Sequence, residues 1–157
     1  MRIKGIISIF FLFAVFFALN NEILKGKVIG VSDGDSITIL TADFTQVKIR
    51  LHGIDCPEKS QDFGNKAKQF TADLCFGKTV KVEALDTDRC GRTIGMVTLP
   101  DSKNLNKELL KVGLAWHCKY FDQSNEFSEL EETAKREKVG SWMHSNAVAP
   151  WEFRKVK

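Results

Sequence analysis

The order of strand-like and helix-like segments is the feature that most constrains how this chain folds. Residues 47–51 alternate between apolar and polar, which places Val47, Ile49 and Leu51 on one face of a half-buried strand. Turn residues at 32–35 join two further strand-like segments, which predicts a hairpin. Strands are therefore predicted at 27–31, 36–40, 47–51, 79–84 and 93–99.

Three other segments carry apolar residues at helical spacing. The first, at residues 67–75, lies between the third and fourth predicted strands and ends at Gly77. The second covers residues 105–112, and the third runs from its capping residue Ser124 to about residue 139. Five short strands with one helix between the third and fourth follow the order of an OB-fold barrel. We therefore predict an α+β (mainly β) fold, a five-stranded OB-fold barrel with three helices.

The first 19 residues differ in composition from the rest of the chain. Arg2 and Lys4 precede an apolar run at residues 6–19, which is the pattern of a secretory signal. This run is shorter than the roughly 20 apolar residues that a membrane-spanning helix needs. We predict that residues 1–23 are a signal peptide, with an uncleaved N-terminal membrane anchor as the alternative, and that residues 24–157 form the domain. The protein is then exported to the periplasm or the extracellular space.

The net charge does not by itself predict nucleic-acid binding. The whole chain has a formal net charge of +3, but 21 basic and 20 acidic residues remain after residue 19, a net charge of +1. Any such function must rest on where individual charges lie. The four cysteines permit three complete disulfide pairings, and their spacing is not that of a structural zinc site. They are Cys56, Cys75, Cys90 and Cys118.

Acidic residues stand at the predicted hairpin and after the third predicted strand. Asp33 and Gly34 alone indicate only a common turn, but that turn does not require Asp35. Asp55 alone also fits an ordinary turn before Pro57. Together, two aspartates from neighbouring strands supply the charged ligands that Ca²⁺ takes beside carbonyl and water oxygens. Since Asp35 follows the hairpin turn and Asp55 ends the third strand, we expect the two side chains to lie close together.

Two arginines and a glutamate accompany these aspartates. Arg50 and Arg92, each taken alone, fit solvent-exposed side chains, and Glu58 fits a solvated one. Guanidinium groups, however, suit the oxygens of a phosphate on which charge develops, and a free carboxylate suits the proton of an attacking water. The combination predicts phosphodiester cleavage, with Arg50, Glu58 and Arg92 as catalytic residues.

Three segments resemble the motifs of the staphylococcal nuclease (thermonuclease) family. They are residues 31–36, 50–58 and 88–92. The similarity continues through residues 64–77, 112–116 and 140–142, and the closing segment 150–154 is similar to that of exported bacterial members. The resemblance therefore covers nearly everything after the leader.

The resemblance implies an OB-fold barrel that cleaves DNA and RNA with calcium and leaves 3′-phosphate ends. By position, the calcium ligands correspond to Asp35, Asp55 and the backbone carbonyl of Cys56. The remaining implied residues are Arg50 and Arg92, which bind the phosphate, and Glu58, which acts as general base.

The chain departs from the family pattern where the substrate base is contacted. Cys90 stands where an aromatic residue is common, and Tyr120 is the only tyrosine in place of a pair. Tyr120 and Arg89 are the predicted substrate contacts, whereas Trp116 and Trp142 are assigned to packing.

Two other classes of protein fit the sequence less well. An inactive OB-fold module that only binds nucleic acid is the main alternative. Inactive family members typically lose the site residues, which are all present here. An exported structural or inhibitor protein gives no reason for those residues to occur in family register. The leading prediction is a calcium-dependent nuclease of DNA and RNA, monomeric and without a protein partner.

Overall fold

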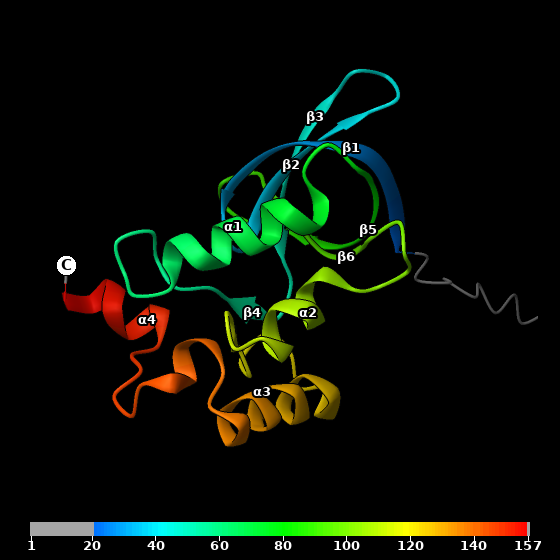
Figure 1. The fold of residues 1–157 in the computed structure, drawn as a ribbon. Helices are drawn as coiled ribbons and strands as arrows, with labels where there is room; N and C mark the ends of the chain where they lie inside the picture. The colour runs from blue at the N-terminus through cyan, green and yellow to red at the C-terminus, as the bar shows by residue number, and fades with distance from the viewer. Residues whose placement is uncertain (1–20, 157) are drawn as a thin grey trace, which may run out of the picture.

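Five strands close a barrel in the order β1-β2-β3-β6-β5 in the computed structural model, which describes residues 21–156 (Figure 1). This confirms the predicted OB-fold barrel and the mainly β, α+β class. The predicted signal peptide or anchor at residues 1–23 lies, up to residue 20, outside the described residues. The strands are β1 (Glu22–Asp33), β2 (Ser36–Thr41), β3 (Gln46–Leu51), β5 (Thr79–Thr87) and β6 (Thr93–Thr98).

Alternating side chains fill the barrel with aliphatic residues. Neighbouring strands run antiparallel, except β3 and β6, which are parallel. Ile37 and Ile39 of β2 and Ile49 and Leu51 of β3 are fully buried, as the alternation predicts. β1 begins earlier than the predicted strand, at Glu22, because its first residues pair with β5.

Three helices correspond to those predicted from the spacing of apolar residues. They are α1 (Gly64–Cys75), α2 (Leu105–Lys111) and α3 (Asn125–Glu137). Ser124 caps α3 as expected, because its hydroxyl accepts a hydrogen bond from the backbone N–H of Phe127. α3 ends slightly before residue 139, since Lys138 adopts a left-handed conformation with φ 53°.

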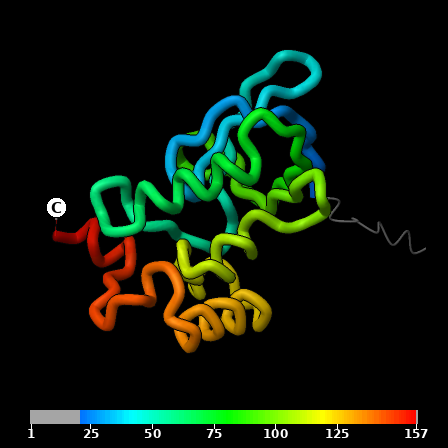
Figure 2. The backbone as a smooth tube through the Cα atoms, viewed as in Figure 1, coloured from blue at the N-terminus to red at the C-terminus, as the bar shows by residue number. Residues whose placement is uncertain are grey.

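A fourth helix, α4 (Pro150–Phe153), lies between the 3₁₀ turns η1 (Gly140–Met143) and η2 (Arg154–Val156). The expected count of three helices was therefore too low, because a helix of one turn leaves no periodic pattern. The chain around α4 lies beside the loop that precedes α1 (Figures 1 and 2). There the side-chain amide of Gln61 donates a hydrogen bond of 2.6 Å to the Val148 carbonyl.

A small second sheet pairs β4 (Ile54–Asp55) with β7 (Trp116–His117). The sequence predicted that Asp55 ends the third strand, and this prediction was wrong, because Asp55 belongs to β4. β3 stops at Leu51, and Gly53, with φ 72°, turns the chain into β4.

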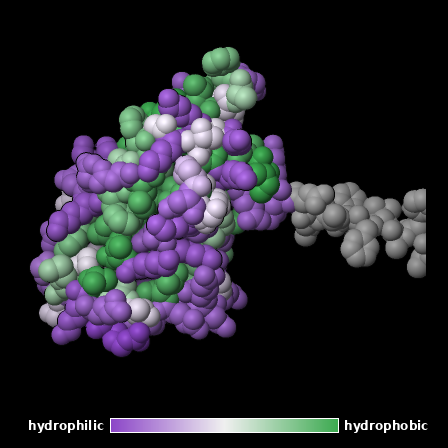
Figure 3. Space-filling model, turned by 45° about the vertical axis from the view of Figure 1, so that its right-hand side comes forward, coloured by the Kyte–Doolittle hydropathy of each residue, from purple (hydrophilic) through white to green (hydrophobic). Residues whose placement is uncertain are grey.

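The face of the molecule shown in Figure 3 mixes hydrophilic and hydrophobic areas. The turn between β2 and β3 projects from the barrel and carries Phe44, which is 84% exposed. Among residues 21–156, no helix has the length and apolar character needed to cross a bilayer.

Candidate active site

Arg50 joins the two predicted metal carboxylates. Its Nη1 lies 2.6 Å from Asp35 Oδ2, as an ion pair rather than an aligned hydrogen bond, and its Nη2 donates to Asp55 Oδ1 at 2.9 Å. The three side chains come from the end of β3, the β1–β2 turn and β4. The expected proximity of Asp35 and Asp55 is therefore present, although β4 and not β3 supplies Asp55.

The turn that carries Asp35 has no room for a side chain at Gly34. A Cβ there would lie 2.7 Å from Ala67 Cβ on α1 and 2.8 Å from Cys56 Sγ. Asp35 Oδ2 accepts a 2.6 Å hydrogen bond from the backbone N–H of Cys56. The hairpin turn, α1 and the residue after β4 thus fix one another, which sets the position of the Asp35 carboxylate.

Burial and charge act in opposite directions at this centre. Desolvation raises the pKa of Asp35 to about 7, even though the nearby Arg50 guanidinium lowers it. Burial alone would lower the pKa of Arg50, but Asp35 and Asp55 hold it above its ordinary value. Arg50 therefore stays charged, while Asp35 is an acid that a bound cation would help to ionise.

The donor set at this centre consists of hard oxygen atoms. Two buried carboxylates, Asp35 and Asp55, face the same side chain, and such oxygens are the ligands that Ca²⁺ prefers. Within residues 21–156 there is no cluster of three or more His, Cys, Asp or Glu side chains arranged for a metal. A calcium ion here would complete its shell with backbone carbonyl, water and substrate oxygens, so the residues fit the ion.

Cys56 presents its thiol to the interior and not to solvent. The residue is buried, and desolvation raises the pKa of its thiol well above the usual value. The thiol is therefore protonated and unreactive at neutral pH, which leaves only the main chain of Cys56 as a possible metal donor. Cys56, Cys75, Cys90 and Cys118 are all free cysteines in this structure.

Glu58 is held in the loop that leads to α1. Its backbone N–H donates to Gln61 Oε1 at 3.1 Å, and its carbonyl accepts from Gln61 N at 2.8 Å. A side chain at Gly64 would overlap the Glu58 carbonyl oxygen, so the start of α1 closes tightly on this loop. The Glu58 side chain is 36% exposed, which allows its carboxylate to contact water.

Arg92 lies on the turn between β5 and β6 and faces the same centre. Its Nε pairs with Asp88 Oδ2 at 2.6 Å, and its backbone N–H donates to Asp88 Oδ1 at 2.9 Å. Arg89 is exposed on this turn and, in the described chain, does not line the cleft beside Arg92. That cleft has a volume of about 570 Å³, and the predicted residues that line it are Asp35, Arg50, Asp55, Cys56, Glu58 and Arg92.

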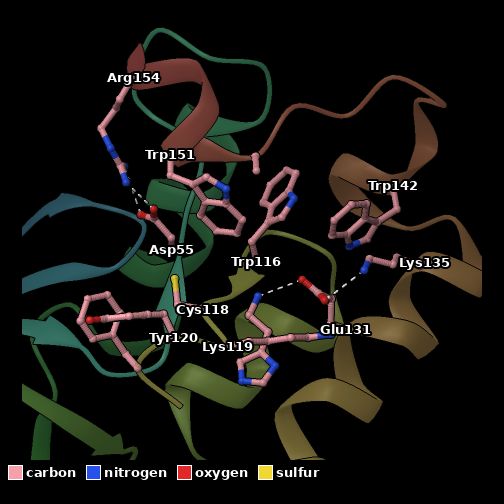
Figure 4. Close-up of a pocket in the computed structure, with 13 residues that line it drawn as sticks. Asp55, Trp116, Cys118, Lys119, Tyr120, Glu131, Lys135, Trp142, Trp151 and Arg154 are labelled. Atoms are coloured by element: carbon pink, nitrogen blue, oxygen red, sulfur yellow. Dashed lines mark hydrogen bonds and ion pairs between the residues drawn. The ribbon is translucent and has the colours of Figure 1, made fainter. Parts of the chain in front are cut away.

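Tyr120 lies outside this cleft, on the wall of a neighbouring aromatic cavity of about 670 Å³ (Figure 4). Its ring is 88% exposed and meets Phe121 edge-on at 4.9 Å. The ring centroids of Trp116 and Trp142 lie 4.6 Å apart, so the two indoles pack against each other, as predicted from the sequence. Both rings also line this cavity. The packing assignment therefore missed that the two rings border an open cavity.

Arg154 is the site residue that sequence reasoning missed. Its Nη2 lies 2.6 Å from Asp55 Oδ2, and its Nη1 lies 2.7 Å from Glu58 Oε1. Arg154 and Asp55 line both the cleft and the aromatic cavity, so they form the wall between them. The sequence shows Arg154 only as part of the closing segment 150–154, and no spacing links it to Asp55.

Comparisons with known proteins agree with this geometry. The family model described as "Staphylococcal nuclease homologue" matches residues 48–144. An "Uncharacterized endonuclease" of Haemophilus influenzae is 34% identical over 148 residues, which cover 94% of this chain and 83% of the relative. A "Micrococcal nuclease" of Shigella flexneri is 36% identical over 142 residues, which cover 84% and 81%.

Proposed function

Because the chain belongs to the staphylococcal nuclease family, we propose that it is a calcium-dependent nuclease that hydrolyses DNA and RNA to products with 3′-phosphate ends. The observation that carries this proposal is that two carboxylates bridged by Arg50 share one cleft with Glu58 and Arg92. Charges of both signs, placed around a space large enough for a phosphodiester, suit hydrolysis better than simple binding.

The metal ligands in this proposal are Asp35, Asp55 and the main-chain carbonyl of Cys56. When bound, calcium supplies positive charge that stabilises the negative charge gathering on the phosphate during attack. Arg50 fixes the positions of the two carboxylates relative to each other, because it contacts one oxygen of each. Its charge also faces the position that a phosphate would take in the cleft.

Glu58 takes the proton of the attacking water in the same proposal. The water oxygen forms the new bond to phosphorus, and the bond from phosphorus to the 5′-oxygen breaks. The 5′-oxygen leaves as a hydroxyl after taking a proton from solvent water, and the phosphate stays on the 3′-oxygen. Arg50 and Arg92 bind the remaining phosphate oxygens, whose charge increases in the transition state.

The substrate is contacted mainly through its backbone in this proposal. Charged groups in the cleft address the phosphate, which every sequence shares, so cleavage is not specific for the sugar or the sequence. Arg89 adds a further phosphate contact. Tyr120 and the indole rings of the aromatic cavity offer surfaces on which bases stack.

We also propose that residues 1–23 direct export, either as a cleaved signal peptide or as a retained anchor. The enzyme then works as a monomer in the periplasm or outside the cell. N-terminal sequencing of the protein recovered from outside the cytoplasm tests this part. A start between residues 19 and 24 supports cleavage, whereas a start at Met1 in the membrane fraction supports the anchor.

The products of the reaction test the proposed chemistry. Residues 21–157 are incubated with single-stranded DNA, double-stranded DNA and RNA in calcium, and the ends of the fragments are analysed. We expect cleavage of all three, with fragments that a polymerase extends only after a 3′-phosphatase has acted. Fragments that are extended directly would contradict the proposed direction of attack. Binding without cleavage in any divalent metal would instead indicate a binding module.

A further inference from the structure

Arg154 contacts two residues of the proposed reaction centre but has no task in the reaction described above. Figure 4 shows its guanidinium pointing at Asp55 from the C-terminal segment, here defined as residues 148–156. The same group reaches Glu58 at 2.7 Å. A side chain at the end of the chain therefore joins a proposed metal ligand to the proposed general base.

This contact occupies the oxygen atoms that a cation needs. Arg154 Nη2 lies 2.6 Å from Asp55 Oδ2, and Arg50 Nη2 lies 2.9 Å from Asp55 Oδ1. Both oxygens of the carboxylate are thus bound by guanidinium groups. A calcium ion on Oδ2 would meet the like charge of Arg154 within a few ångströms, a distance at which like charges repel.

Arg154 is the more exposed of the two guanidinium groups that contact Asp55. Its side chain is 45% exposed, whereas that of Arg50 is 19% exposed and contacts both Asp35 and Asp55. The surrounding backbone is anchored before Arg154, since Pro150 is buried and the Val148 carbonyl accepts a hydrogen bond from Gln61. The Arg154 side chain can therefore turn into solvent while the C-terminal segment stays docked.

We propose that Arg154 is the internal counter-cation of this site. Its guanidinium holds Asp55 and Glu58 while no metal is bound, and it releases Asp55 when the divalent cation binds. This inference rests on the proposed calcium site and deepens it. Its consequence is that Arg154 weakens calcium binding and raises the calcium concentration at which the enzyme becomes active.

Calorimetric titration of calcium into residues 21–157 tests this inference. The variants are Arg154→Gln and a matched control, Lys155→Gln, which removes the same charge from the next residue. Lys155 Nζ lies 2.8 Å from Glu152 Oε1. Among residues 21–156, Lys155 is not one of those that line the cleft. We expect about tenfold tighter calcium binding for Arg154→Gln and a change below about twofold for Lys155→Gln.

Calcium binding by Arg154→Gln that is equal to or weaker than that of the wild type would overturn the inference. A Lys155→Gln variant that binds calcium as tightly as Arg154→Gln would also overturn it.

A second measurement needs no variant at the site. The Nε–Hε signal of Arg154 in the NMR spectrum of the wild-type chain is followed during a calcium titration. We expect it to shift toward that of a solvated arginine as calcium binds. A signal that does not respond to calcium at saturation would also overturn the inference.

The two proposals fail in distinguishable ways. A wild-type chain that neither binds calcium nor cleaves nucleic acid contradicts the proposed function and the inference together. A wild-type chain that cleaves DNA in calcium, but binds calcium no more weakly than Arg154→Gln, contradicts the inference alone.

Discussion

Replacing Asp35 by asparagine should change how the stability of the metal-free protein depends on pH. Desolvation raises the pKa of Asp35 in the folded state to about 7, from an ordinary value of 3.8. Between these values the folded state holds a proton that the unfolded state has lost. Folding stability therefore falls as pH rises from about 4 to about 7, and it levels off above the folded pKa.

The size of this effect follows from the shift. The slope reaches about 1.4 kcal/mol per pH unit in the middle of this window and falls to half of that at the folded pKa, so the Asp35 contribution changes by about 2.3 kcal/mol between pH 5 and pH 7. The amide that Asp35→Asn introduces cannot ionise, so the variant lacks this contribution. Other groups titrate in both proteins, and the difference between the two curves isolates Asp35.

Urea unfolding of both proteins in a chelator, at pH 5, 6, 7 and 8, measures these free energies. We expect the wild type to lose about 2.3 kcal/mol relative to Asp35→Asn between pH 5 and pH 7, and little more above that. A difference between the two proteins that stays constant over this range would refute the reasoning. It would mean that Arg50 keeps Asp35 ionised in the folded state despite burial.

Four further substitutions test the roles of single residues. Glu58→Gln should lower turnover sharply and leave substrate affinity largely unchanged, since a neutral amide cannot accept the proton; unchanged turnover in a single-turnover assay would remove Glu58 from the mechanism. Arg50→Lys and Arg92→Lys should each raise the activation free energy of cleavage by about 2–4 kcal/mol, because lysine cannot form two parallel hydrogen bonds to a phosphate. A loss of less than about tenfold in kcat/KM would show that the arginine concerned does not stabilise the transition state. Cys56→Thr should remain active under reducing conditions, because only its main chain faces the metal; a folded but inactive variant, judged by circular dichroism and cleavage, would show that the thiol matters.

The barrel and most of its helices were predictable from local pattern. Alternation of apolar residues in β2 and β3 reflects burial on one face, and this pattern occurs wherever one face of a strand points into a barrel. The helix cap at Ser124 is equally local, since its hydroxyl bonds the backbone only three residues away. By contrast α4 has four residues and begins with a proline, so no periodicity marks it.

The site was predictable only as far as neighbouring strands determine it. Asp35, Arg50 and Asp55 come together because one hairpin and the following turn bring them to the same end of the barrel. Arg154 reaches Asp55 across 99 residues through the packing of the C-terminal segment, and nothing in its local sequence reveals this. Likewise the sequence predicts only a packing role for the indole of Trp142, because the cavity that it lines is formed by residues far apart in the sequence.

Cleavage of DNA in calcium and in a chelator, by the wild type and by Glu58→Gln, tests the central claim most directly. Glu129→Gln serves as the control, because Glu129 is exposed on α3 and, within residues 21–156, lines neither the cleft nor the aromatic cavity. The account predicts that the wild type and the control cleave in calcium and stop in the chelator, while Glu58→Gln binds DNA and barely cleaves it. Cleavage by the wild type in the chelator would contradict the account. Cleavage by Glu58→Gln in calcium at the rate of the wild type would also contradict it.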